Sequence, residues 1–235
     1  RSRDPAKLGP CDMLIDVGGQ YNHDSRRYDH HQKSFSETWS EKHRTPLSSA
    51  GLIYRHYGAA VIEAALPEDT KHMAATLHDQ FYTSLVEPFD AHDNGISRYS
   101  AEAVPAFSRS LDIFQQVADM NPTWNEGGDA WSKMNERFEA VVALVGEAWD
   151  RRLKAEVARI AALKIVSAGV RNAASENSRY VMLSKECPWM ESIFEVEGDA
   201  IDAGILAAGQ LLFVFFPMYN GKWKVQSIPK SATLQ

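Results

Sequence analysis

Six acidic or imidazole side chains fall in three short, widely separated stretches of this sequence. They are Asp16, Asp29, His30, His31, Asp90 and Asp93. Carboxylate oxygens with one or two imidazoles suit Mn²⁺ or Mg²⁺ better than a metal that seeks thiolates. Two such ions about 3.5–4 Å apart can hydrolyse a phosphodiester, because one makes hydroxide from bound water and both stabilise phosphoryl charge. The residue types therefore favour metal-dependent phosphoester hydrolysis.

The order of the residues suggests a role for each. Asp16 could bridge two metals, His30 could ligate one of them, and Asp93 could complete the same coordination sphere. His31 would point to the opposite face of an extended backbone, where it could reach a substrate phosphate or act as an acid. Asp29 is better suited to orient a histidine from behind.

Each of these residues also has an ordinary structural alternative. An aspartate after an apolar strand, such as Asp16, is often a turn residue, and two adjacent histidines are often a solvated loop pair. Asp90 and Asp93 could cap the next turn at a helix end. A carboxylate is unfavourable at the C-terminal end of a helix, however, and a bound cation would remove that penalty. Which of the two aspartates binds metal stays open.

The first two stretches are predicted to lie at strand ends. Apolar residues over 11–17 predict a buried strand with Asp16 near its carboxyl end, where ligands gather in open α/β sheets. A second short strand is expected to end over residues 28–31. The polar stretch 33–46 that follows has the composition of a loop.

The third stretch is predicted to end a helix. Apolar spacing predicts one helix that ends at residue 66, with Ser48 or Ser49 as its cap. A second helix is expected over residues 70–89, and it delivers the two later aspartates just before Asn94-Gly95 ends it.

The second half of the chain changes character. Residues 100–130 suggest a short helix and then a loop, and a long helix is expected over 130–166. A strand is predicted over 179–184 and a hairpin over 211–228 around Asn220-Gly221, while 200–210 could be loop or short helix. We therefore expect an α/β fold, with a first domain and its helical extension over 1–170 and a smaller α+β domain over 171–235.

Composition places the chain among ordinary globular proteins. Of its 235 residues 44% are hydrophobic and 24% are charged, and the net charge of −6 argues against coating nucleic acid by bulk charge. Two cysteines provide no disulfide framework, which favours a reducing intracellular setting. No apolar run approaches the roughly 20 residues that a membrane span needs.

Six motifs resemble those of the MYG family in the DHH phosphoesterase superfamily. They are Ile-Asp-Val-Gly-Gly, Arg-Tyr-Asp-His-His-Gln-Lys-Ser-Phe, Leu-Ser-Ser-Ala-Gly-Leu-Ile-Tyr, Asp-Asn-Gly-Ile-Ser, Asn-Pro-Thr-Trp-Asn and Cys-Pro-Trp. They occur in family order between residues 15 and 189, and the hairpin at 211–229 also fits.

The resemblance implies a DHH-type α/β fold and a 3′→5′ exonuclease of nuclei and mitochondria that acts on single-stranded RNA with two Mn²⁺ or Mg²⁺ ions. By motif, Asp16 corresponds to the metal aspartate of the second motif. The third motif corresponds to Asp29, His30 and His31, and the fourth to Asp93 or Asp90.

Two family features do not occur in these residues. The first motif, similar to His-x-Gly-x-Phe-His-x-Asp-Glu, would lie just upstream of Arg1, and a Gly-Gly-His stretch would lie beyond Pro229. Without the first motif one metal would lack most of its ligands, so the sequence could be a fragment, an incomplete gene model or a shortened member, and the chain as written could be inactive. Rival hypotheses are hydrolysis of pyrophosphate or small nucleotide diesters, and binding without catalysis. Trp189 and Trp223 could stack on bases, with burial in the small domain as the alternative.

Overall fold

The computed structural model describes residues 3–99, 112–126 and 132–230, and the chain forms two compact units. The first unit covers residues 1–145 and the second covers 146–235. One helix, α6 (Met134–Ser175), continues from one unit into the other, so the boundary expected near residue 170 falls inside it. The mixed α/β class agrees with the prediction. No helix in the described ranges is long and apolar enough to cross a bilayer.

A small three-stranded sheet follows helix α1 (Pro5–Leu8) in the first unit. Its strands are β1 (Leu14–Ile15), β2 (Tyr21–Asn22) and β3 (Arg27–Tyr28), in the order β1-β3-β2. β1 runs parallel to β3, and β2 pairs with β3 in the antiparallel sense.

Two strand predictions need correction. The strand expected over 11–17 is two residues long and lies at a sheet edge, so Leu14 is buried while Ile15 is 48% exposed. The strand expected to end over 28–31 stops at Tyr28, and β2 was not predicted. Asp29, His30 and His31 therefore begin a loop at the end of β3.

Helix α2 (Ser49–Ala65) confirms the first helix prediction. Ser48 is its N-cap, and the Ser48 hydroxyl accepts a hydrogen bond from the Ala50 N–H at 3.1 Å. The cap satisfies one of the N–H groups that a helix leaves free in its first turn.

The single helix expected over 70–89 is instead a series of four helical segments. They are η1, a 3₁₀ turn (Glu68–Met73), α3 (Ala74–Phe81), η2, a π turn (Tyr82–Val86), and α4 (Glu87–Asp93). Pro88 accounts for the π turn, because proline has no N–H and its ring would collide with the Ser84 carbonyl in regular helix. The helix backbone therefore widens into the π turn just before Pro88.

The predicted stop after α4 is confirmed. Gly95 adopts a positive φ of 67°, its N–H bonds to the His92 carbonyl at 3.1 Å, and the Ile96 N–H bonds to the Ala91 carbonyl at 2.8 Å. This pair of bonds is a Schellman motif, which satisfies the carbonyls of the last turn. Asp90 and Asp93 consequently lie in the final turns of α4.

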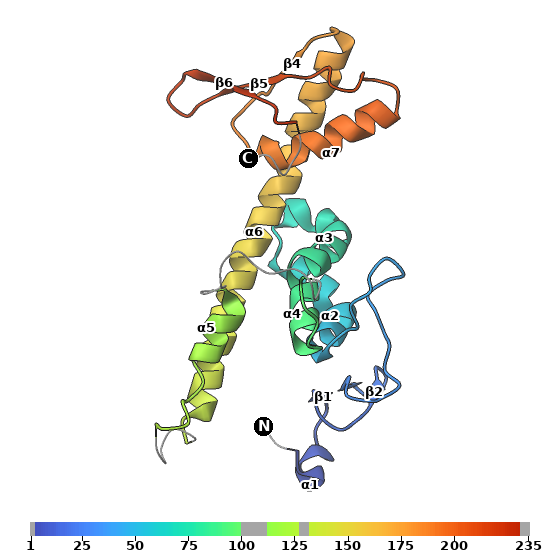
Figure 1. Cartoon of the computed structure of the whole chain (residues 1–235), viewed down its shortest axis with the longest axis vertical. Helices are drawn as coiled ribbons and strands as arrows, with labels where there is room; N and C mark the ends of the chain where they lie inside the picture. The colour runs from blue at the N-terminus through green and yellow to red at the C-terminus, as the bar shows by residue number, and fades with distance from the viewer. Residues whose placement is uncertain (1–2, 100–111, 127–131, 231–235) are drawn as a thin grey trace. The chain divides into compact units, whose positions relative to one another are not determined.

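The core of the first unit forms where α2 packs on α3 and α4 (Figure 1). Its fully buried side chains are Leu47, Leu52, Ile62, Leu77, Phe81, Tyr82 and, from β3, Tyr28. Each such side chain contributes roughly 1.5–3 kcal/mol through burial.

The short helix expected within 100–130 is α5 (Ile113–Asp119), and residues 100–111 and 127–131 lie outside the described ranges.

The second unit contains a separate sheet, with strands β4 (Tyr180–Met182), β5 (Phe213–Pro217) and β6 (Trp223–Ser227) in that order. β4 and β5 are parallel and joined through α7 (Trp189–Asp202), a helix that was not predicted. β5 and β6 form the predicted antiparallel hairpin. One face of the sheet packs against α6 and α7 in a single core.

Candidate metal centre

The turn after β1 places Asp16 in a strained backbone conformation. Asp16 has φ +63°, and Gly18 and Gly19 follow with φ of 100° and 66°. The left-handed region costs a residue with a Cβ about 1–2 kcal/mol, and such residues gather at functional sites. The Ser49 hydroxyl donates to Oδ1 of Asp16 at 3.0 Å, so the first residue of α2 holds this carboxylate.

Asp29 is buried and links the glycine turn to His31. Its Oδ2 accepts from the Gly19 N–H at 2.7 Å, and its Oδ1 accepts from the backbone N–H and Nδ1 of His31 at 3.1 and 2.6 Å. Burial raises the pKa of Asp29, but these hydrogen bonds outweigh it and leave the pKa lowered. Asp29 is therefore an ionised carboxylate that fixes the ring of His31, the arrangement of an orienting group.

The imidazole of His30 lies between two carboxylates. Its Nε2 is 3.6 Å from Oδ1 of Asp16 and 3.2 Å from Oδ2 of Asp93, while the side chain is only 7% exposed. Within the described part of the chain this buried nitrogen has no hydrogen-bond partner. An unsatisfied buried nitrogen facing two carboxylates costs free energy that a shared cation would relieve.

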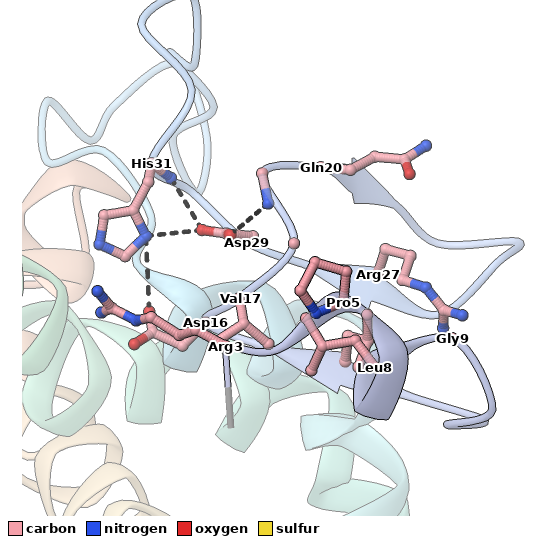
Figure 2. A pocket seen from close by; sticks show the side chains of 13 residues that line it. Arg3, Pro5, Leu8, Gly9, Asp16, Val17, Gln20, Arg27, Asp29 and His31 are labelled. Carbon is pink, nitrogen blue, oxygen red and sulfur yellow. Dashed lines mark hydrogen bonds and ion pairs between the residues drawn. The ribbon is translucent and has the colours of Figure 1, made fainter. Parts of the chain in front are cut away.

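Three side chains present ligand atoms close enough to share one ion. Asp16, His30 and His31 each offer an atom, and these atoms all lie within 4.8 Å of one another. Nδ1 of His31 is 3.9 Å from Oδ1 of Asp16, and Figure 2 shows the two side chains facing one another. His30 is the buried member and the other two are about half exposed, so the cluster opens to solvent. The hydrogen bond that Nδ1 of His31 donates to Asp29 raises the pKa of His31 in spite of burial.

Asp90, the other aspartate of α4, lies outside this cluster. It is fully buried, and its Oδ1 accepts from the N–H and hydroxyl of Ser48 at 2.9 and 2.7 Å and from the Gly51 N–H at 3.0 Å. Its Oδ2 accepts from the Tyr82 hydroxyl at 3.0 Å. Burial raises the pKa of Asp90, and the four donors offset only part of that rise. The geometry thus brings Asp93 to the cluster and uses Asp90 to fasten α4 to the start of α2.

The two serines at the start of α2 position both acidic segments. Ser48 caps α2 and binds Asp90, while Ser49 binds Asp16. From the sequence, these serines were predicted only as alternative caps of the helix. A helix has one N-cap, so the second of two adjacent serines was a signal that its hydroxyl was available for another partner.

A cavity of about 670 Å³ adjoins the cluster (Figure 2). Its lining includes Asp16, Asp29, His31, Arg3 and the glycine turn. The volume lies within the range of about 300–1,000 Å³ that small-molecule sites occupy. Arg27 also lines it, but the Arg27 guanidinium donates to the backbone carbonyls of Cys11, Asp12, Ser25 and Arg26 and so holds the strand connections together.

Sequence comparison identifies the family to which this constellation belongs. The profile MYG1_exonuc, described as an uncharacterised protein family (UPF0160), matches residues 1–234. The chain belongs to this MYG1 family. It is 36% identical over 98% of its length to MYG1 exonuclease of Bos taurus and 35% identical over 98% to that of Homo sapiens. A MYG1 protein of Saccharomyces cerevisiae is 32% identical over 99% of the chain and 70% of its own length.

Family membership confirms the resemblance drawn from the six motifs. The chain spans 61% of the length of the bovine and human relatives. No solved structure matches it.

Proposed function

We propose that this chain is part of a metal-dependent 3′→5′ exonuclease that hydrolyses single-stranded RNA on a DHH-type α/β fold. The observation that carries the proposal is the buried Nε2 of His30, without a hydrogen-bond partner among the described residues and close to the carboxylates of Asp16 and Asp93. Family membership supports the reaction class, because the bovine and human relatives are named MYG1 exonuclease.

The donor set fits a hard divalent cation. Asp16 and His30 would hold the ion together with Asp93, which lies beside His30, because Nδ1 of His31 is already bonded to Asp29. Their oxygen and imidazole donors suit Mn²⁺ or Mg²⁺. A bound ion of this kind supplies a water of lowered pKa and neutralises charge on a phosphoryl group. A second ion, which the family resemblance implies, would need carboxylates or imidazoles beyond these three.

The remaining residues would position and protonate the substrate. Because Nδ1 of His31 is bonded to Asp29, its Nε2 is the nitrogen that can reach a phosphate oxygen. The carboxylate of Asp29 favours the protonated ring, so His31 can donate a hydrogen bond to the phosphate or a proton to the leaving oxygen. Gly18 and Gly19 carry no side chains that would keep a phosphate from the turn.

Hydrolysis assays of the full-length form with Mn²⁺ on three substrates test this proposal. A 3′→5′ exonuclease shortens a 5′-labelled single-stranded RNA stepwise and releases mononucleotides, and Asp16→Asn or His30→Ala abolishes this activity. If only pyrophosphate or small nucleotide diesters are cleaved, these compounds and not RNA are the substrates. Mn²⁺ binding without hydrolysis of any substrate would leave only a binding function, and Mn²⁺ binding unaffected by His30→Ala would refute the metal centre.

The same resemblance leads us to propose action in the nucleus and mitochondria. Imaging of a tagged chain beside markers of both compartments tests this, and a signal absent from both would contradict it.

A further inference from the structure

The cavity beside the candidate metal centre differs in character between its two sides. Asp16 and His31 line one side, and Figure 2 shows the guanidinium of Arg3 on that same side. Helix α1 lies across the cavity from His31 and lines it with Pro5 and Leu8 (Figure 2). The cavity therefore has a charged side at the cluster and an apolar side at α1.

The apolar side is built by three segments of the chain. Pro5 and Leu8 come from α1, Leu14 comes from β1, and Val17 comes from the turn after β1. Leu14 is buried, and Leu8 and Val17 are partly buried. A ligand that covers the apolar surface these side chains leave open is stabilised, because that surface is removed from water. The apolar side thus favours a ligand with an apolar body over a small inorganic anion.

Arg3 brings a positive charge into the cavity lining that a ligand can use. Arg27 also lines the cavity, but its guanidinium donates to four backbone carbonyls. The Arg3 side chain is exposed, and the described ranges of the chain hold no hydrogen-bond or ion-pair partner for it. A guanidinium presents its N–H donors in a planar fork that fits two oxygens of one phosphate. The charged side therefore suits a phosphate, which would lie between Arg3 and the ion that the cluster is proposed to hold.

We propose that this cavity is a terminal-nucleotide pocket, which holds the last nucleotide of the RNA with its 5′-phosphate beside Arg3 and its nucleoside against the apolar side. This role rests on the proposed function, because a 3′→5′ exonuclease adds water to the phosphate that joins the last two nucleotides. The bond from phosphorus to the 3′-oxygen of the penultimate nucleotide breaks, and that oxygen takes up a proton. The other product is a nucleoside 5′-monophosphate, whose one phosphate and one apolar body match the two sides of the cavity.

The size and position of the pocket suit the end of a chain. Its volume of about 670 Å³ lies in the range of small-molecule sites. A strand that continued beyond the terminal nucleoside would have to pass α1, which stands across the cavity from His31 (Figure 2). Pyrophosphate is a poorer occupant, because it would leave Leu8 and the other apolar side chains uncovered.

Calorimetric titration with AMP, in Mn²⁺ and separately in EDTA, tests the pocket without requiring hydrolysis. AMP should bind at least about tenfold more tightly than either adenosine or methyl phosphate, because only AMP contacts both sides. Mn²⁺ should tighten AMP binding, because the ion gives the phosphate a further partner.

Two substitutions address the two sides of the pocket separately. Arg3→Ala should lower the affinity for AMP and for methyl phosphate at least about tenfold, because it removes a charge-assisted contact to the phosphate. Leu8→Ser should lower the affinity for AMP about fivefold and leave that for methyl phosphate unchanged. Lys7→Ala is the matched control, since Lys7 is an exposed cation of α1 outside the cavity lining and should leave the affinity for AMP unchanged.

Shortening of single-stranded RNA by the full-length form separates failure of this inference from failure of the proposed function. Affinity for AMP that depends on Arg3 and Leu8, without any shortening of RNA, would keep the nucleotide pocket and refute the exonuclease. Stepwise shortening of RNA would keep the exonuclease and overturn the pocket if Arg3→Ala and Leu8→Ser variants that melt like the unaltered chain bind AMP unchanged. Absence of AMP binding in both Mn²⁺ and EDTA would also overturn the pocket. Equal affinities for AMP and methyl phosphate, with no effect of Leu8→Ser, would overturn it in favour of a site for phosphate alone.

Discussion

Separate substitutions of Asp90 and Asp93, the two aspartates of α4, are the sharpest test of the candidate metal centre. The sequence left Asp90 and Asp93 as alternative ligands, and the structure gives them different surroundings. Asp90 is fully buried and accepts four hydrogen bonds, while the Asp93 side chain is 53% exposed and lies 3.2 Å from His30. We expect substitutions at Asp90 to change stability and substitutions at Asp93 to change metal affinity.

The magnitudes follow from the partners of each carboxylate. Asp90→Ala leaves the N–H and hydroxyl of Ser48, the Gly51 N–H and the Tyr82 hydroxyl without an acceptor. Each unsatisfied buried group costs about 1–3 kcal/mol, so the loss is about 4 kcal/mol or more, a large part of a typical 5–15 kcal/mol stability. Asp90→Asn keeps Oδ1 and removes a charge whose burial is unfavourable, so we expect a loss of about 1 kcal/mol. Asp93→Asn should change stability by less than about 0.5 kcal/mol, as exposed substitutions do.

Urea unfolding followed by circular dichroism measures the stabilities, and calorimetric titration with Mn²⁺ measures the affinities. Asp93→Asn should weaken Mn²⁺ binding at least about tenfold, equivalent to about 1.4 kcal/mol, while Asp90→Asn should weaken it less than about threefold. Asp90→Asn that abolishes Mn²⁺ binding with an unchanged unfolding midpoint would reverse the assignment. An Asp93→Asn variant that binds Mn²⁺ as tightly as the unaltered chain would also reverse the assignment.

Three further predictions concern the surroundings of the centre. Gly51→Ala should destabilise by about 1–3 kcal/mol, because the new Cβ would lie 2.3 Å from Oδ2 of Asp90, whereas Gly146→Ala in open space on α6 should be neutral or stabilising in the same thermal melts. Asp16→Gly should be more stable than Asp16→Ala by about 1–2 kcal/mol, because only alanine carries a Cβ in the left-handed backbone, and equal melting temperatures would refute strain at this residue. Burial and the neighbouring His23 lower the pKa of His56 below 6.5, so the unfolded chain takes up the proton first and stability falls as the pH drops through that value. His56→Gln should show a smaller loss of unfolding free energy between about pH 7.5 and 5.5, and an identical pH dependence would contradict this.

Features governed by neighbouring residues were predictable from the sequence. The start of α2 at a serine cap, the stop of α4 at Asn94-Gly95 and the hairpin at Asn220-Gly221 each depend on a few adjacent residues with known backbone preferences. The approach of Asp16 to His30 and His31 was also predictable, because all three were expected at strand ends and the parallel strands β1 and β3 end at the same sheet edge. Pro88 was a visible signal for the break before α4 that the prediction of one continuous helix did not use.

Features that depend on distant partners were not predictable in this way. The short edge strand β1, the left-handed turn at Asp16 and the burial of Asp90 all depend on where other segments lie. Spacing alone therefore could not separate Asp90 from Asp93. The same limit applies to the two tryptophans, because Trp189 is covered by the core of the second unit while Trp223 is exposed on β6.

The two serines at the start of α2 connect the stability of the first unit to the geometry of its candidate metal centre. Ser48 binds Asp90 and thereby fixes α4, which carries Asp93 one helical turn later. Ser49 binds Asp16 from the adjacent position. The carboxylates of Asp16 and Asp93 beside His30 are thus both positioned by the first turn of α2, Asp16 directly and Asp93 by way of Asp90 on the same helix. A shift of this turn would therefore move both carboxylates at once. A site built on a rigid helix start in this way can keep carboxylates close together without an ion, because the fold supplies the free energy that opposes their repulsion.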